Sequence, residues 1–173
     1  MSVDRVAQST IPPWELVNSE QLQAQLEALA AISEAPPPVV TRILFSEADL
    51  KARDFIKAIC SKLGLAFRED AVGNLFARWK GKDETLPPVA TGSHIDAIPN
   101  AGRYDGVVGV LGGLEAFRVL KESGFQPVRS LELIVFTAEE PTRFGIGCLV
   151  GVGWRPFEPE ISNCTAIKVT DDG

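Results

Sequence analysis

Histidine is nearly absent from this chain: His94 is the only one among 173 residues. A mechanism that needs two imidazoles therefore cannot be completed within these residues. Cysteine is also scarce, and Cys60, Cys148 and Cys164 are odd in number and widely spaced. They match neither a disulfide framework nor paired CxxC metal knuckles. We expect Cys60, which lies inside an apolar helical pattern, to be a buried free thiol.

Positive charge is in deficit, and long apolar runs are missing. The chain has 17 Lys and Arg against 23 Asp and Glu, and its net charge of −6 offers no basic surface to nucleic acid or anionic lipid. No apolar stretch approaches the roughly 20 residues that a membrane-spanning helix needs. Residues 1–14 contain nothing like the apolar middle region of a signal peptide. We therefore expect a cytoplasmic protein with neither a nucleic-acid nor a membrane partner.

Hydrophobic residues still make up 45% of the chain, which is enough for the core of one globular domain. Leucines at helical spacing predict a first helix within Asn18 to Ser33, with Asn18 or Ser19 as its N-cap. A second helix is expected to begin at Ser46 as its N-cap and to end at Gly64. The buried stripe of this second helix is predicted to consist of Leu50, Ile56, Ile59 and Leu63.

The rest of the chain alternates between strand and helix patterns. Strands are predicted at residues 65–68 and 75–80, and an apolar strand at 88–92 leads into His94. An apolar helix over 107–123 and a strand over 131–137 follow, which together form a βαβ unit. We therefore expect an α/β fold with a mostly parallel sheet, in which the strand ends gather His94, Glu139 and Glu140.

Two further patterns are interpreted as packing rather than binding features. The spacing of the helix glycines is not GxGxxG, so close helix-to-sheet packing is preferred over a nucleotide-binding βαβ domain; these glycines are Gly106, Gly109, Gly112 and Gly113. No basic stripe accompanies the tryptophans, so they are predicted to be packing residues and not a stacking platform: Trp14, Trp79 and Trp154.

A group of polar residues lies where apolar strands end or the apolar helix begins: His94, Asp96, Asp105, Glu139 and Glu140. Carboxylates held close together repel, so such a group raises one pKa or binds a cation. An imidazole with several carboxylates suits zinc, manganese or another first-row divalent ion. Structural roles stay open for each residue: a satisfied core or loop histidine, a helix N-cap or turn aspartate, and two solvated glutamates.

Three motifs, in this order, resemble the hydantoinase/carbamoylase family of amidases, a branch of the dinuclear-metal aminoacylase and carboxypeptidase superfamily. They are Thr91-Gly-Ser-His-Ile-Asp96, Gly102-Arg-Tyr-Asp-Gly-Val-Val-Gly109 and Phe136-Thr-Ala-Glu-Glu-Pro-Thr-Arg-Phe-Gly145. The resemblance implies a three-layer αβα zinc-peptidase-like catalytic domain, here incomplete. Residues 1–149 would form the N-terminal part of that domain, and residues 150–173 a divergent tail of unknown fold.

The resemblance also implies residue roles. His94, Asp105 and Glu140 would hold two divalent ions, manganese or zinc, with Asp105 bridging them. Glu139 would be the general base that deprotonates the attacking water, and Asp96 would orient His94. A strained peptide is implied after Asp105, with cis geometry as one form of that strain.

The implied activity is metal-dependent hydrolysis of a C–N bond in a linear ureido or amidine acid, a small-molecule substrate of ureide and purine catabolism. The motif from Glu139 onward is most similar to ureidoglycolate amidohydrolases; allantoate and N-carbamoyl-amino-acid hydrolases are the alternatives. Arg143 is a candidate contact for the substrate carboxylate. Full-length members form homodimers and supply two further histidine ligands. A second hypothesis, of a different class, is therefore that the chain is an inactive truncated product that only binds a partner subunit.

Overall fold

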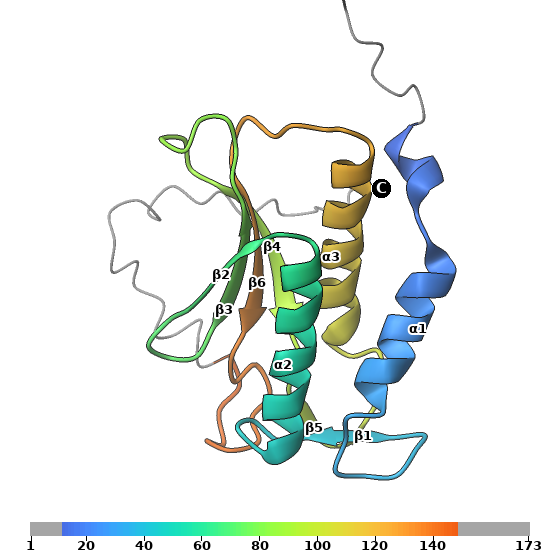
Figure 1. The fold of residues 1–173 in the computed structure, drawn as a ribbon. Helices are drawn as coiled ribbons and strands as arrows, with labels where there is room; N and C mark the ends of the chain where they lie inside the picture. Colours follow the sequence, from blue (N-terminus) through green and yellow to red (C-terminus); the bar gives the residue numbers. More distant parts are fainter. Residues whose placement is uncertain (1–11, 149–173) are drawn as a thin grey trace, which may run out of the picture.

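A four-stranded sheet with helices on one face makes up most of the structure, a computed structural model that describes residues 12–148 (Figure 1). The mixture of helices and strands confirms the predicted α/β class. In chain order the elements are η1 (Pro13–Leu16), α1 (Ser19–Ala30), β1 (Val40–Arg42), α2 (Glu47–Lys62), β2 (Ala66–Glu69), β3 (Leu75–Trp79), β4 (Val89–His94), β5 (Ala97–Ala101), α3 (Val107–Glu122) and β6 (Leu131–Phe136).

The first two α-helices begin at the caps that the sequence predicts. The Asn18 side chain accepts a hydrogen bond from the Gln21 amide at 2.9 Å, directly before α1. The Ser46 hydroxyl accepts one from the Asp49 amide at 3.3 Å, directly before α2. Each cap satisfies an amide that has no partner inside the helix. Gly64, with φ +63°, follows the end of α2 as predicted.

The buried stripe of α2 differs from the prediction at Leu50, which is 51% exposed. The fully buried residues are spaced four apart along the helix: Ala52, Ile56 and Cys60. Leu50 precedes Ala52 by two residues, so it projects about 200° around the helix from this stripe. A small alanine therefore occupies the buried position, and the leucine faces outward.

The main sheet has the strand order β2-β3-β6-β4. The βαβ unit is confirmed, because β4 and β6 are parallel, with Val89 opposite Leu131 and His94 opposite Phe136. The prediction of a mostly parallel sheet is wrong for the described strands, since β2 pairs with β3 and β3 pairs with β6 in antiparallel register. The connection from β2 to β3 is too short for the crossover that a parallel pair requires.

The helices α2 and α3 bury their apolar sides against a single face of this sheet, and α1 packs against α3 (Figure 1). Their shared core includes Leu29, Ile56 and Leu111 from the helices, with Leu75 and Leu133 from the strands. Residues 12–148 thus supply the sheet and one helical layer, and the second helical layer of the predicted three is not formed by them. The predicted tail, 150–173, lies outside the described residues.

A second, two-stranded sheet is not predicted by the sequence. In it β1 and β5 are antiparallel, with Val40 opposite Ala101 and Arg42 opposite Ala97. Pro99 lies inside β5, and proline argues against a strand unless the strand is at an edge. Because β5 begins three residues after His94, this small sheet fixes the chain direction just beyond β4.

Helix α3 approaches the sheet closely because glycines face it. A Cβ at Gly109 would lie 2.6 Å from the Ser93 Cβ, and one at Gly113 would lie 2.7 Å from Leu133 Cδ1. The packing interpretation is therefore confirmed at these two glycines. It is wrong at Gly112, where a Cβ would meet no atom within 4 Å.

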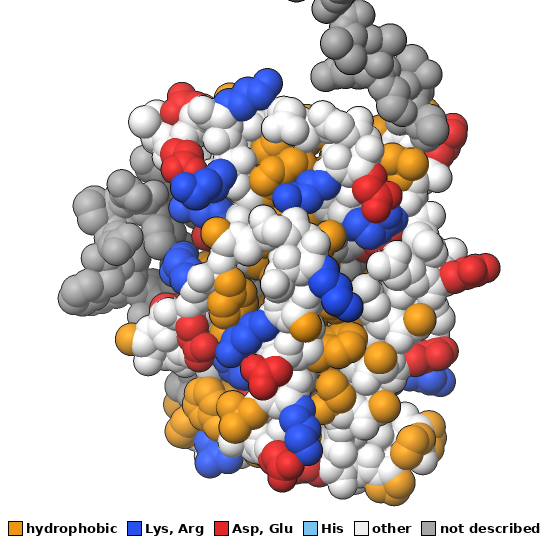
Figure 2. Space-filling view, viewed as in Figure 1, with side chains coloured by type: hydrophobic (Ala, Val, Ile, Leu, Met, Phe, Trp, Pro, Cys, Tyr) orange, Lys and Arg blue, Asp and Glu red, His pale blue; other side chains and the backbone are white. Residues whose placement is uncertain are grey.

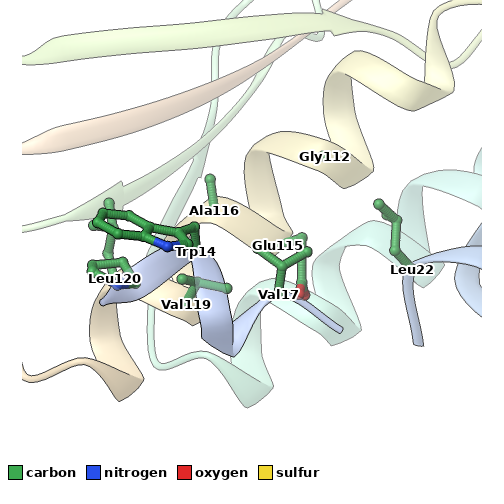
Figure 3. Close-up of a pocket in the computed structure, with 9 residues that line it drawn as sticks. Trp14, Val17, Leu22, Gly112, Glu115, Ala116, Val119 and Leu120 are labelled. Carbon is green, nitrogen blue, oxygen red and sulfur yellow. The ribbon is translucent and has the colours of Figure 1, made fainter. Parts of the chain in front are cut away.

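Gly112 instead lines an apolar pocket of about 480 Å³ between η1 and α3, which also contains Trp14 (Figure 3). Trp14 is 74% exposed, so its prediction as a packing residue is wrong. Trp79 does pack, with edge-to-face contacts to Phe117 and Phe125 at ring-centroid distances of 6.5 and 6.3 Å. Trp154 lies outside the described residues.

Cys60 is fully buried, as predicted, and burial raises the pKa of its thiol to about 11. Iodoacetamide at pH 8 is therefore expected to leave Cys60 unmodified in the native chain, because the thiol is both inaccessible and protonated. Peptide mass spectrometry after timed labelling measures this. Cys148, which is exposed, is the internal control and should be labelled before Cys60. Equal labelling rates for the two thiols would contradict the buried position of Cys60.

The surface in the view of Figure 2 carries Lys and Arg side chains interspersed with Asp and Glu. This face therefore presents mixed charge and not a basic stripe. Among residues 12–148, none of the helices combines the length and the hydrophobicity needed to cross a membrane.

Candidate metal centre

His94 and the pair Glu139 and Glu140 come together because they follow parallel neighbouring strands. His94 is the last residue of β4, and the glutamates lie three and four residues after the end of β6. The register places His94 opposite Phe136, so both strands end at the same edge of the sheet. One ligand atom from each of the three residues lies within 4.8 Å of the others.

Asp105, which lies just before α3, brings a third carboxylate to the imidazole of His94. Its Oδ1 lies 3.9 Å from His94 Nε2, and Glu139 Oε2 lies 3.5 Å from that atom. The structure thus gathers His94, Asp105, Glu139 and Glu140, four of the residues singled out in the sequence. We call this group the carboxylate–imidazole cluster.

Asp96 lies on the other side of the imidazole ring. Its backbone carbonyl oxygen is 3.0 Å from His94 Nδ1, and its Oδ1 is 3.6 Å from the same nitrogen. Because a carbonyl oxygen only accepts, the contact favours the neutral tautomer with its proton on Nδ1, in which the Nε2 lone pair is directed at the carboxylates. Asp96 Oδ2 also accepts a hydrogen bond from the Glu140 amide at 3.0 Å. Asp96 is therefore placed to orient both neighbours.

Gly106 allows the imidazole to reach this position. A Cβ there would lie 2.5 Å from both Nε2 and Cε1 of His94. Gly106 also has φ +67°, a conformation that L side chains rarely adopt. The cis form of the implied strain after Asp105 is not found: within the described residues the cis peptide is Pro37–Pro38, and Gly106 instead has a positive φ.

The electrostatics of the cluster favour an added cation. Burial and the charges of Asp105 and Glu139 raise the pKa of Glu140. Burial lowers the pKa of His94, but the hydrogen bonds and charge of Asp96 and the charge of Glu139 outweigh it and raise that pKa to about 9. Asp96 Oδ1 is buried without a hydrogen-bond partner within the described part of the chain. The excess of carboxylates over one imidazole fits a divalent ion with nitrogen and oxygen ligands.

Arg143 is anchored by a backbone carbonyl oxygen. Its Nε donates a hydrogen bond to the Leu44 carbonyl oxygen at 2.7 Å, which links the loop after β6 to the segment before α2. The side chain is otherwise exposed. A contact between Arg143 and a substrate carboxylate stays a prediction.

A buried arginine, to which the sequence analysis assigns no role, holds the turn that follows His94. Arg42 is 1% exposed and donates to the carbonyl oxygens of Leu29 at 2.6 Å and of Ile95 at 2.7 Å. It also donates to the Ile32 carbonyl oxygen at 2.8 and 3.0 Å. Ile95 lies between His94 and Asp96, so Arg42 ties that turn to the end of α1. The available signal is an arginine inside the apolar run 39–45.

A second buried arginine holds the chain just before the glutamates. Arg53 pairs with Asp49 at 3.0 Å and donates to the Thr137 hydroxyl at 3.0 Å. The Thr137 amide in turn donates to Asn74 Oδ1 at 2.9 Å. These contacts hold Thr137, which directly follows β6 and lies two residues before Glu139.

Comparison with known proteins identifies relatives of the same architecture. The model of Peptidase family M28 matches residues 74–151. The chain is 63% identical over 133 residues to the ureidoglycolate hydrolase of Oryza sativa subsp. japonica, a match that covers 77% of this chain and 28% of that protein. A crystal structure of AtUAH in complex with glyoxylate matches at TM-score 0.76 and 59% identity, covering 77% of this chain and 31% of that one. An amidase of the hydantoinase/carbamoylase family from Burkholderia ambifaria matches at TM-score 0.73 and 39% identity, covering 76% and 32%.

The fold and these relatives define the chain as part of a zinc-peptidase-like amidohydrolase domain. Within that class, it belongs to the hydantoinase/carbamoylase family of amidases, as its motifs predict. The chain spans 28% of the length of the Oryza protein. The individual roles of the clustered residues stay predictions.

Proposed function

We propose that the chain carries the metal-binding part of a hydrolase that cleaves a C–N bond in ureidoglycolate. The carboxylate–imidazole cluster is the observation that carries this proposal. Relatives named ureidoglycolate hydrolase, from Oryza and Arabidopsis thaliana, share 63% and 59% identity with the chain. Relatives named for N-carbamoyl-L-amino acids and allantoate share 38% and 37%, so these substrates rank second.

In this proposal His94, through Nε2, Asp105 and Glu140 would hold two divalent ions, manganese or zinc. Bound metal would lower the pKa of the attacking water and polarise the scissile carbonyl. Glu139 takes the proton from that water and passes it to the departing ammonia. Its Oε2, 3.5 Å from His94 Nε2, already faces the nitrogen that we assign to the metal. Asp96 keeps the imidazole oriented through its carbonyl oxygen.

The substrate end of the proposal rests on the shape of ureido acids. Ureidoglycolate, allantoate and N-carbamoyl amino acids share a planar urea-like group and a carboxylate. Solved structures of AtUAH contain glyoxylate and (S)-hydroxyglycine, which are small acids as well. We propose that Arg143, whose guanidinium is held by Leu44, contributes positive charge for that carboxylate.

A non-enzymatic function is the second candidate, and the number of imidazoles favours it. His94 is the only histidine among the 173 residues, and it would serve two proposed ions. With that ligand set, metal affinity depends on water completing each coordination sphere. The chain would then bind a full-length subunit without turning over substrate.

Ammonia release from ureidoglycolate in the presence of Mn²⁺ tests the proposal. We expect Glu139→Gln to lower any release by about 100-fold or more, because general-base catalysis contributes that much. Glu84→Gln, a change at an exposed glutamate paired with Lys80, is the matched control and should leave the rate unchanged. If the parent chain binds Mn²⁺ but releases no ammonia, and His94→Ala abolishes the Mn²⁺ binding, the binding-partner function would be supported. Release that survives both Glu139→Gln and His94→Ala would overturn the proposed site.

A further inference from the structure

The loop after Glu140 folds back onto Glu139 and contacts it twice through one residue. The Cys148 amide donates a hydrogen bond to the Glu139 carbonyl oxygen at 2.7 Å. The Cys148 thiol donates a second one to Glu139 Oε1 at 3.4 Å. Both the backbone and the carboxylate of Glu139 are therefore held by Cys148.

The neighbouring Gly147 permits this close return of the chain. A Cβ at position 147 would lie 2.7 Å from the Glu139 carbonyl oxygen and 3.6 Å from Pro141 Cδ. Any side chain at 147 would thus push the loop off Glu139. The requirement for glycine here arises from close backbone approach, since the positive-φ glycine of this loop is Gly145.

Backbone strain lies on both sides of the contact. Ala138, directly before Glu139, has φ +57°, and Cys148 has φ +53°. Positive φ is uncommon for residues other than glycine and persists where the surrounding structure imposes it. Such residues cluster at functional sites, and here two of them flank the same glutamate contact.

We propose that Cys148 is a positioning residue for Glu139. The thiol occupies Oε1, so the carboxylate presents its other oxygen, Oε2, toward His94 Nε2. A thiol is a weak donor, so it can fix the orientation of the carboxylate while leaving its negative charge available for a proton. The functional meaning of this contact rests on the proposed role of Glu139 as general base. The contact itself is a feature of the structure and is independent of that role.

The infrared S–H stretching band tests the contact directly. In a chain carrying Cys60→Ala and Cys164→Ala, Cys148 is the only thiol. We expect its band at lower frequency than in the same chain with Glu139→Ala, because a hydrogen bond to a carboxylate weakens the S–H bond. Glu140→Ala, at the adjacent carboxylate, is the matched control and should leave the band near its original position. An unchanged band in Glu139→Ala would overturn the proposal.

The positioning role is tested by the Glu139 carboxyl carbon in ¹³C NMR, with the resonance assigned through Glu139→Gln. Cys148→Ala is expected to shift this resonance, and Cys148→Ser, which keeps a donor, to restore it. A role confined to stabilising the loop would move the unfolding temperature and not this signal selectively. If serine and alanine behave alike, the thiol does not orient Glu139. Neither spectrum depends on turnover. If both spectra change as expected but the chain releases no ammonia, the proposed reaction is refuted and the contact between Cys148 and Glu139 is not.

Discussion

Replacing Arg42 by methionine is expected to lower the free energy of unfolding by about 3 kcal/mol. The substitution removes the guanidinium donor from the carbonyl oxygens of Leu29, Ile32 and Ile95, of which only the Leu29 oxygen is known to keep another donor, the Ile32 amide at 3.1 Å. Each unsatisfied buried group costs about 1–3 kcal/mol, and relief from burying the guanidinium offsets part of the sum. The burial cost is visible in the pKa of Arg42, which desolvation lowers to about 10. The side chain nevertheless stays charged at neutral pH.

Urea unfolding followed by circular dichroism measures this loss. Arg129→Met is the matched control, because Arg129 is exposed and makes one hydrogen bond to the residues described, to the Pro87 carbonyl oxygen at 3.1 Å. We expect that variant to remain within about 0.5 kcal/mol of the parent chain. Arg42→Lys should fall between the two, since one ammonium cannot span both the end of α1 and Ile95. Equal unfolding midpoints for Arg42→Met and Arg129→Met would show that the buried network contributes no stability.

The features that the sequence predicts well depend on near neighbours along the chain. Asn18 and Ser46 cap their helices because a short polar side chain reaches an amide three residues later. Gly64 ends α2 because it adopts positive φ without strain. The gathering of His94 with Glu139 belongs to the same category, because a βαβ unit brings two strand ends to one edge whatever surrounds it.

The features that the sequence misses depend on contacts between distant segments. β1 and β5 become strands only by pairing with each other, and Pro99 argues against the second of them. The outward position of Leu50 follows from which side of α2 meets the sheet, and several apolar stripes on that helix look equivalent in the sequence. Arg42 resembles a surface residue until its partners, up to 53 positions away, are known.

Gly106→Ala is expected to weaken Mn²⁺ binding by about 100-fold or more while the chain stays folded. The new methyl group would lie 2.5 Å from His94 Nε2, the atom that we assign to the metal, so the imidazole must move. Displaced partners of a metal ligand typically cost 10–100-fold in affinity, and here the ligand itself moves. Calorimetric titration with Mn²⁺ measures the loss, and circular dichroism reports whether the fold survives.

Two glycines separate the clash at Gly106 from its backbone strain. Gly102, in the same loop, has open space and no positive φ, so Gly102→Ala should bind Mn²⁺ like the parent chain. Gly124 has φ +77° and open space, so Gly124→Ala carries the strain without the clash and should lose stability but not metal affinity. Parent-like Mn²⁺ affinity in folded Gly106→Ala would mean that His94 Nε2 is not a metal ligand. If Gly106→Ala is the only one of the three variants that loses Mn²⁺ affinity, the ion binds at His94 Nε2, which is accessible because Gly106 has no Cβ.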